Sequence, residues 1–290
     1  MSMIPAAEHS DEMSKPPAAP VTTIRPPRGW APLDLREFTG AHELLYFLVL
    51  RNLKLRYKQT VLGAAWAVLQ PLLTMAVFTV VFGRLARLGS DGLPYPVFAL
   101  AALVPWTYFA NALTQASTSL VDQHQLLTKV YFPRLLLPLA AVIAGLVDLV
   151  ISFVMLLVVL AWYGITPSVR LLAVPAFALL AVASALAPGI WLAALNVRYR
   201  DVRYIIPFLV QIWLFATPVA YSSSLVPERW RAMYGLNPMV AVVDGFRWMV
   251  APAARMPGTV IAFSVGAVVL VLMAGLFFFR RVERTFADVV

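Results

Sequence analysis

Long runs of apolar residues, separated by short basic segments, constrain this chain more than any other feature. A helix needs about 20 apolar residues to cross a bilayer. Six runs approach or exceed that length: Val61–Phe82, Val97–Leu120, Leu135–Tyr163, Leu171–Val197, Ile205–Tyr221, which is the shortest, and Thr259–Phe279. Composition agrees, because 61% of the 290 residues are hydrophobic and 13% are charged, whereas a soluble domain carries roughly 25% charge. The sequence therefore predicts an all-α polytopic membrane protein with six transmembrane helices.

The distribution of Lys and Arg predicts its orientation. An even number of spans places both termini on one side, where twelve cations gather: Arg51, Lys54, Arg56, Lys58, Lys129, Arg134, Arg198, Arg200, Arg203, Arg280, Arg281 and Arg284. The opposite side has seven: Arg84, Arg87, Arg170, Arg229, Arg231, Arg247 and Arg255. Because positively charged loops stay in the cytoplasm, we expect both termini there. The net charge of +9 is explained by this orientation, and no nucleic-acid partner is expected.

Two segments precede the first run. Residues 1–32 are rich in Pro, Ala, Ser and charge and lack the apolar core of a secretory signal, so they predict a disordered cytoplasmic tail. Residues 33–290 form the expected membrane domain. Within it, residues 44–59 mix leucines with Arg51, Lys54, Arg56 and Lys58. This pattern predicts an amphipathic helix in the headgroup plane, its cations facing anionic lipid. A solvated linker helix is the alternative.

The segment Asp122–Leu137 is polar and lies between the second and third runs. Its polar side chains cannot sit unpaired in hydrocarbon, while Leu126, Leu127, Val130 and Tyr131 give one side of a two-turn helix an apolar surface. We expect a short amphipathic helix at the cytoplasmic face that needs a partner surface. The alternative is an interfacial loop without a partner.

The segment Ser222–Pro257 is too apolar for a water-exposed loop. It predicts two short helices, broken at Asn237-Pro238, that dip back into the outer leaflet. Such a re-entrant backbone is tolerated only where protein or a cavity surrounds it.

The residues that several kinds of catalytic or metal site require are absent from this sequence. No phosphate-binding G-x-x-x-x-G-K-[ST] motif occurs, there is no cysteine, and the three histidines have no metal-ligand spacing. A membrane glycosyltransferase is disfavoured, because no cytoplasmic loop clusters carboxylates for a metal and a nucleotide sugar. Asp148 is the one acidic residue well inside a run and stands alone there. An intramembrane carboxylate suggests function, so packing and substrate contact both stay open, and an ion-coupled carrier has weak support.

Aromatic residues gather in three of the runs. Their flat faces are suited to stack on sugars, which would let a long hydrated polymer slide through a channel; the alternative is an interfacial aromatic belt with core packing. The candidates are Trp66, Phe78, Phe82, Trp106, Tyr108, Phe109, Trp213, Phe215 and Tyr221.

A series of motifs carries a family likeness. LRNLKLRYKQTVLGAAWAVLQPLL is followed by LVPWTYFANAL, LLTKVYFPRLLLPLA, NVRYRDVRYIIPFLVQIWLFATPVAY and LNPM. This order resembles the membrane subunit of type-2 ABC exporters for surface polysaccharides. O-antigen exporter permeases (Wzm-like) are the closest group, and capsule and teichoic-acid permeases are near relatives. The resemblance runs from about Leu33 to the C-terminus.

The resemblance implies roles for three segments. Asp122–Pro133 matches the family's coupling helix, which docks in a groove of a separate ATPase subunit, and Leu44–Gln59 matches its interface helix. The implied ATPase-coupling residues are Asp122, Gln123, His124, Leu126, Leu127, Lys129, Tyr131, Phe132, Pro133, Arg134, Arg200 and Asp201. Pro227–Val250 matches the paired re-entrant helices. Its implied periplasmic gate comprises Trp230, Tyr234, Asn237, Pro238, Phe246 and Trp248.

The resemblance also implies the assembly and its cargo. Two permeases and two ABC ATPases would form an exporter in the bacterial inner membrane, with the channel between the permeases. This chain would need no cofactor, since ATP and Mg would bind the partner ATPase. The cargo would be an undecaprenyl-pyrophosphate-linked polysaccharide. Arg51, Lys54, Arg56 and Lys58 would attract its pyrophosphate, or only anchor the helix to membrane lipid. A capsule or teichoic-acid polymer, a small hydrophobic drug and an ion-coupled carrier are the alternatives.

Overall fold

The computed structural model describes residues 41–58, 65–129, 132–166, 168–251, 256 and 258–283, and for residues 127–129 it describes the backbone alone. These residues form helices joined by turns, and no strand occurs among them. The expected tail at residues 1–32 lies outside the described residues. The predicted all-helical fold is therefore confirmed for the described part of the chain.

Five described helices are long and apolar enough to cross a membrane. They are α3 (Ala65–Phe78) continued by the π-helical segment η1 (Thr79–Leu85), α4 (Tyr95–Asp122), α6 (Leu136–Trp162), α7 (Val174–Arg198) preceded by the 3₁₀ segment η2 (Val169–Ala173), and α11 (Gly258–Glu283). The remaining predicted span, the fifth in chain order, is occupied by α8 (Val202–Ala216), which has 15 residues. At 1.5 Å per residue α8 is about 22 Å long, shorter than the ~30 Å hydrocarbon core. The described part of the chain thus has five long apolar helices and one shorter one.

Helix α8 ends five residues before the predicted end of the fifth span. Pro218 follows Thr217, which has φ −109° and ψ 142°. This is the extended backbone that a residue before proline adopts, because the proline ring disfavours the α region there. Thr217, Pro218, Val219 and Ala220 then run as a buried turn. The prediction that the helix continues to Tyr221 was wrong for this reason.

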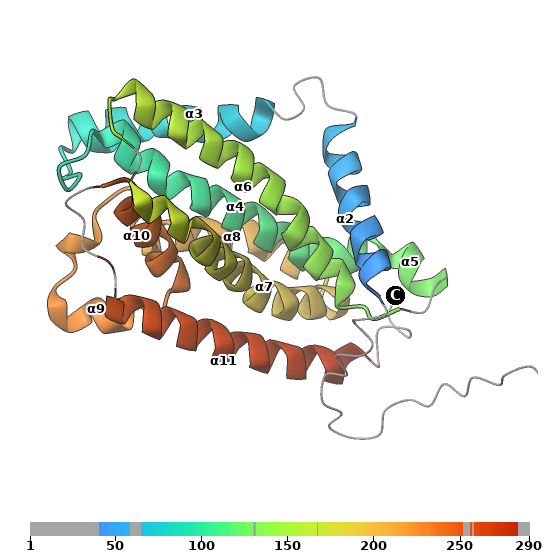
Figure 1. Ribbon diagram of the computed structural model, residues 1–290. Coiled ribbons are helices and arrows are strands. Elements are labelled where there is room, and N and C mark those ends of the chain that lie inside the picture. Colours follow the sequence, from blue (N-terminus) through green and yellow to red (C-terminus); the bar gives the residue numbers. More distant parts are fainter. Residues whose placement is uncertain are drawn as a thin grey trace, which may run out of the picture.

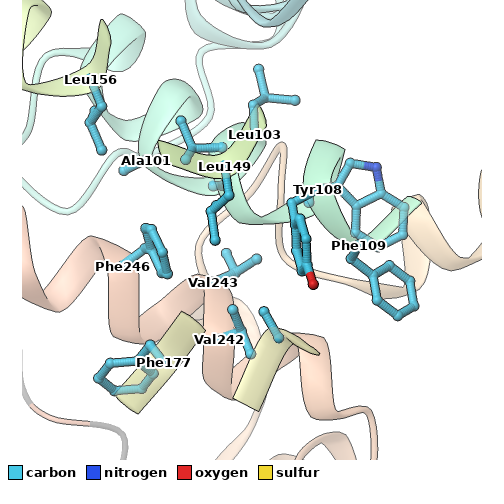
Figure 2. Packing of buried hydrophobic residues seen from close by; sticks show 14 of the residues in the cluster. Ala101, Leu103, Tyr108, Phe109, Leu149, Leu156, Phe177, Val242, Val243 and Phe246 are labelled. Carbon is cyan, nitrogen blue, oxygen red and sulfur yellow. The ribbon is translucent and has the colours of Figure 1, made fainter. Parts of the chain in front are cut away.

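Helix α4 lies at the centre of the bundle (Figure 1) and packs mainly on α7 and α6. Small residues allow this close packing: Ala99, Ala101, Ala102, Ala112 and Ala116 are fully buried. Figure 2 shows Phe177 and Phe246 in the same core as Leu149 and Val243. Gly245 permits the closest approach, because a Cβ there would lie 2.1 Å from Cε1 of Phe177. In contrast, α3 lies on the outside of the bundle, where its residues are exposed or half-buried and only Pro71 is buried.

The two ends of the bundle gather different segments (Figure 1). One end, here called the α5 end, holds α5 (His124–Lys129), the turn between α7 and α8, the start of α2 (His42–Tyr57) and the end of α11. The other, the α10 end, holds η2, α9 (Glu228–Tyr234) and α10 (Pro238–Val250). The α5 end is the one for which the cation count predicted a cytoplasmic position.

Helix α2 occupies residues 42–57, close to the predicted 44–59. It crosses the α5 end of the bundle and packs against α6, with Leu48 buried. Its apolar and charged side chains are intermixed, since Tyr46, Phe47 and Leu55 are exposed while Arg56 is partly buried. The prediction that all four of its cations face anionic lipid was therefore wrong for Arg56.

Candidate functional site

The junction between α4 and α5 is held by two other helices, and the start of α6 by a third. Asp122, the last residue of α4, forms an ion pair with Arg203 at the start of α8. Arg51 of α2 donates a hydrogen bond of 2.9 Å to Oε1 of Gln123. Arg134, just before α6, donates one of 2.7 Å to the backbone oxygen of Glu283 at the end of α11. The structure thus brings Asp122, Gln123 and Arg134 together with residues far away in the sequence.

Helix α5 itself is short and lies at the surface of this end. His124 and Gln125 are exposed, and Leu126 is half-buried against the apolar cluster beneath α5. Phe132 packs against the same cluster, and Pro133 precedes the first turn of α6. Arg200 and Asp201 are exposed in the turn between α7 and α8. Tyr131 and Val130 lie outside the described residues, as do the side chains of Leu127 and Lys129, so the predicted apolar side of α5 is described only at Leu126.

Four polar side chains from three helices meet inside the bundle. Arg56 of α2 forms an ion pair with Asp148 of α6 and donates a second hydrogen bond to Gln115 of α4. The hydroxyl of Tyr57 donates to the other oxygen of Asp148. The prediction that Asp148 stands alone was wrong, because α2, expected at the headgroups, brings Arg56 to it. A lone acid in an apolar run was the only sequence signal, and it does not identify the partner.

The other three basic residues of α2 remain outside this cluster. Arg51, Lys54 and Lys58 are exposed. Only these three therefore present their charge to the surroundings of the protein, as the lipid or pyrophosphate prediction requires.

The aromatic residues predicted to line a channel divide into two groups. Trp106, Tyr108 and Phe109 are 5%, 3% and 0% exposed, and the hydroxyl of Tyr108 donates to the backbone oxygen of Val142. They pack within a single chain because they lie on the central helix α4, so the structure gives them a core position and no exposed face. Trp66 is exposed on α3, and Phe78 and Phe82 are half-buried and pack edge to face.

The two helices α9 and α10 are separated at the predicted Asn237-Pro238 break. Oδ1 of Asn237 accepts a hydrogen bond of 3.1 Å from the backbone N–H of Met239, which caps α10. The same oxygen accepts one of 2.9 Å from Nε1 of Trp213 on α8, and Pro238 occupies the first helical position, where its missing N–H costs nothing. The predicted helix pair is therefore confirmed, with α8 as its support.

The predicted gate residues differ in how deeply they are held. Phe246 is 1% exposed and meets Phe153 of α6 edge to face. Trp248 lies under the guanidinium of Arg170, which donates to the backbone oxygens of Trp248 and Ala251. Tyr234 shares a hydrogen bond of 2.7 Å with Tyr221, and Trp230 is exposed. Phe246 is thus part of the core, and the other three lie nearer the surface.

Arg247 is a structural centre that the sequence did not reveal. Only 5% exposed, it donates to the backbone oxygens of Phe98, Pro218, Val219 and Tyr221, and its guanidinium lies 3.5 Å from the ring centre of Phe98. Burial lowers its pKa to about 10, which Asp244 and Asp91 oppose, so it stays charged at neutral pH. The count of cations on each side of the membrane treats Arg247 as a loop residue. The available signal was a cation within the otherwise apolar residues 238–250.

Within the described residues, no three His, Cys, Asp or Glu side chains form a group that could hold a metal ion. Many polar side chains in the described part of the chain are engaged in ion pairs, helix caps and contacts with backbone oxygens.

Residues 43–251 match the ABC-2 type transporter family. The chain belongs to this family. The permease is 34% identical over 255 residues to "O-antigen export system permease protein RfbA" of Myxococcus xanthus, covering 86% of this chain and 96% of that protein. A Klebsiella pneumoniae protein of the same name is 27% identical over 85% of this chain and 95% of its own length.

A second kind of relative matches at lower identity. "Polysialic acid transport protein KpsM" of Escherichia coli is 23% identical over 82% of this chain and 92% of its own length. All these matches are to the transmembrane subunit, not to an ATPase, so the permease is the membrane part of its transporter and the predicted family is confirmed.

Proposed function

We propose that the permease exports a lipid-linked polysaccharide of the O-antigen type across the bacterial inner membrane. The observation that carries this proposal is the 34% identity over 96% of a protein named for O-antigen export. Two copies of the permease form the channel, and two copies of an ABC ATPase, which bind ATP and Mg, drive it. Both termini and the α5 end face the cytoplasm.

The α5 end supplies the ATPase contact in this proposal. Asp122, Gln123 and Arg134 fix the base of α5, which leaves the exposed face of α5 with Arg200 and Asp201 for docking. Leu127 and Tyr131 insert into the ATPase groove, while Leu126 holds α5 against the bundle. Helix α5 connects α4 to α6. A short helix that is held at its base and exposed along one face can be displaced by the ATPase and transmit that displacement to α4 and α6.

Cargo recognition involves different surfaces. Arg51, Lys54 and Lys58 attract the pyrophosphate at the cytoplasmic leaflet, because a cation can neutralise and bond phosphate oxygens. Trp66, Phe78, Phe82 and Tyr221 are the remaining candidates for a sugar-stacking surface between the two permeases, and Trp230 and Tyr234 for the periplasmic gate. An ion-coupled carrier loses support, since both oxygens of Asp148 already have partners.

A deletion strain tests the cargo. Without the permease we expect surface O-polysaccharide to disappear and undecaprenyl-linked polysaccharide to accumulate inside the cell, with both restored by the plasmid-borne gene. Gel analysis of lipopolysaccharide and mass spectrometry of the lipid fraction measure the two. Normal surface polysaccharide in the deletion strain would overturn the proposal.

A capsular polymer is the second candidate, supported by the match to KpsM. The same strain separates the two, because loss of capsule with intact O-polysaccharide would identify the capsule as cargo. Resistance to hydrophobic drugs, measured alongside, is expected to be unchanged.

A further inference from the structure

The cluster of Arg56, Tyr57, Gln115 and Asp148 lies deep within the membrane part of the permease. Asp148 is twelve residues beyond the start of the 27-residue helix α6, or about 18 Å along it at 1.5 Å per residue. This is near the middle of a ~30 Å hydrocarbon layer. The side chains of Arg56 and Asp148 are 21% and 17% exposed, so little of either charge is left to the surroundings.

Stability alone does not account for charges at this depth. Placing an ionised group at the centre of a membrane is costly, and a well-packed apolar pair often stabilises a buried position as well as an ion pair does. What an ion pair adds is a directional contact between two helices. Here the contact joins α2, which crosses the α5 end, to the interior of α6.

Helix α2 is attached at a second point five residues earlier. Arg51 bonds to Gln123, the residue between α4 and α5, and Arg56 bonds to Asp148 and Gln115. The two attachments lie about 7.5 Å apart along a continuous helix. Helix α2 therefore connects α5 to the middle of α6 by a second route, in addition to the covalent chain. This route consists of the helical segment from Arg51 to Arg56 and the contacts that the two guanidinium groups make.

We propose that Asp148 is a positioning residue for transport, which holds Arg56 so that α2 transmits the displacement of α5 to the membrane-embedded middle of α6. This inference rests on the proposed function, because it needs an ATPase that moves α5. It differs from pyrophosphate binding: the guanidinium of Arg56 is already bonded to an acid and an amide, so its role is internal.

The experiment uses the full-length permease in complex with its ABC ATPase. Surface polysaccharide is measured in cells that lack the chromosomal permease gene, and ATP hydrolysis is measured on the purified complex. The main variant is the double replacement R56Q/D148N, which leaves no unpaired charge in the membrane. We expect unchanged binding to the ATPase, hydrolysis within about twofold of wild type, and export per ATP reduced about tenfold, within the usual range of coupling between sites.

A structural role for the pair predicts a different result. If the pair serves only to hold the fold, the double variant, freed of unpaired charge, would export as wild type does, and that outcome would overturn the proposal. Glu43→Gln is the matched control, because it removes an exposed charge from the same helix, thirteen residues before Arg56, and is expected to leave export per ATP unchanged.

A milder variant decides the matter if the double variant does not accumulate. Tyr57→Phe keeps both charges and removes one hydrogen bond to Asp148. We expect export per ATP to fall about threefold, since one hydrogen bond contributes roughly 0.5–1.5 kcal/mol, whereas an unchanged ratio would reject the proposal. Failure of the wild-type permease to bind its ATPase or to export polysaccharide would instead reject the proposed function.

Discussion

The two ends of the permease hold their helices by different means. At the α10 end, Arg247 is buried and donates to four backbone oxygens, and Asn237 bonds both α8 and α10. At the α5 end, the side chains of Arg203 and Asp122 are 51% and 47% exposed. Hydrogen bonds to a buried charge contribute roughly 1.5–3 kcal/mol each, whereas an exposed ion pair contributes about 0–1 kcal/mol.

This difference indicates which end of the bundle can move relative to the rest of the permease. At the α10 end, Arg247, Asn237 and Phe246 all find partners within one chain, in α4, in α6, in α8 and in the turn that follows α8. At the α5 end an apolar cluster lies beneath α5, but the ion pair of Asp122 with Arg203 is exposed and the side chains of His124 and Gln125 lie at the surface. In the proposed exporter, the α10 end is the fixed frame and the α5 end moves with the ATPase.

The strongest test of the fixed end is Arg247→Met. Removing the guanidinium leaves four backbone oxygens without their donor and removes the cation that most favours the charged form of Asp244. We expect the free energy of unfolding to fall by about 3–5 kcal/mol, as when one partner of a buried charged contact is removed. Thermal unfolding of the purified permease in detergent measures this. Arg231→Met, which removes a half-exposed cation of α9, is the control, and equal losses for both variants would contradict a special role of Arg247.

Asn237→Ala tests the support of α10 by α8. The substitution removes the cap of α10, the acceptor of Trp213 and the donor to Thr217 and Ala216. We expect a loss of about 2 kcal/mol, at the upper end for a helix cap, in the same unfolding assay. Asn237→Asp keeps the two acceptor contacts and should lose about half as much; an equal loss would show that the acceptor contacts contribute little.

The sequence predicts the helices at both ends of the bundle, because helix signals are local. It does not predict the contacts between helices, which join residues far apart in the chain. Asn-Pro marks a helix start because its preferences are local, and Pro218 is a local signal of the same kind for the end of α8. The pair Arg56–Asp148 joins residues 92 positions apart, and Arg247 reaches carbonyls in segments more than 25 positions away. Hydrophobic periodicity assigns residues to a face of one helix and does not identify partners on another.

The aromatic residues show the same limit. Trp106, Tyr108 and Phe109 have the composition expected of a channel wall, yet α4 is the central helix, which places all three in the core. Which helix is central depends on packing: the alanines of α4 let α6 and α7 approach it from two sides. Composition predicts that a polar helix end and an aromatic cluster are present. Tertiary packing determines whether each of them is buried in the core or exposed at a surface.

Leu126→Glu addresses the weakly held end. Leu126 is half-buried against the apolar cluster below α5, so a charge there should lower the stability of the isolated permease by about 1 kcal/mol. Its effect on ATPase binding should be larger, because a charge against the apolar cluster would displace α5, on which docking depends. Co-purification with the ATPase measures binding. Gln125→Glu adds the same charge at an exposed neighbouring position, and comparable loss of binding in both variants would show that charge alone, not the apolar contact, is responsible.

The smallest expected effect belongs to the pair Arg203–Asp122. In the isolated permease we expect a coupling energy of about 0.2–1 kcal/mol in a double-mutant cycle of Arg203→Gln and Asp122→Asn, further reduced at 1 M salt because exposed charges are screened. The complex with the ATPase should give a larger value, since docking on α5 removes water from both side chains and strengthens their interaction. A coupling energy that is equal with and without the ATPase would mean that docking does not reach this pair, and the partner surface would then have to lie on α5 alone.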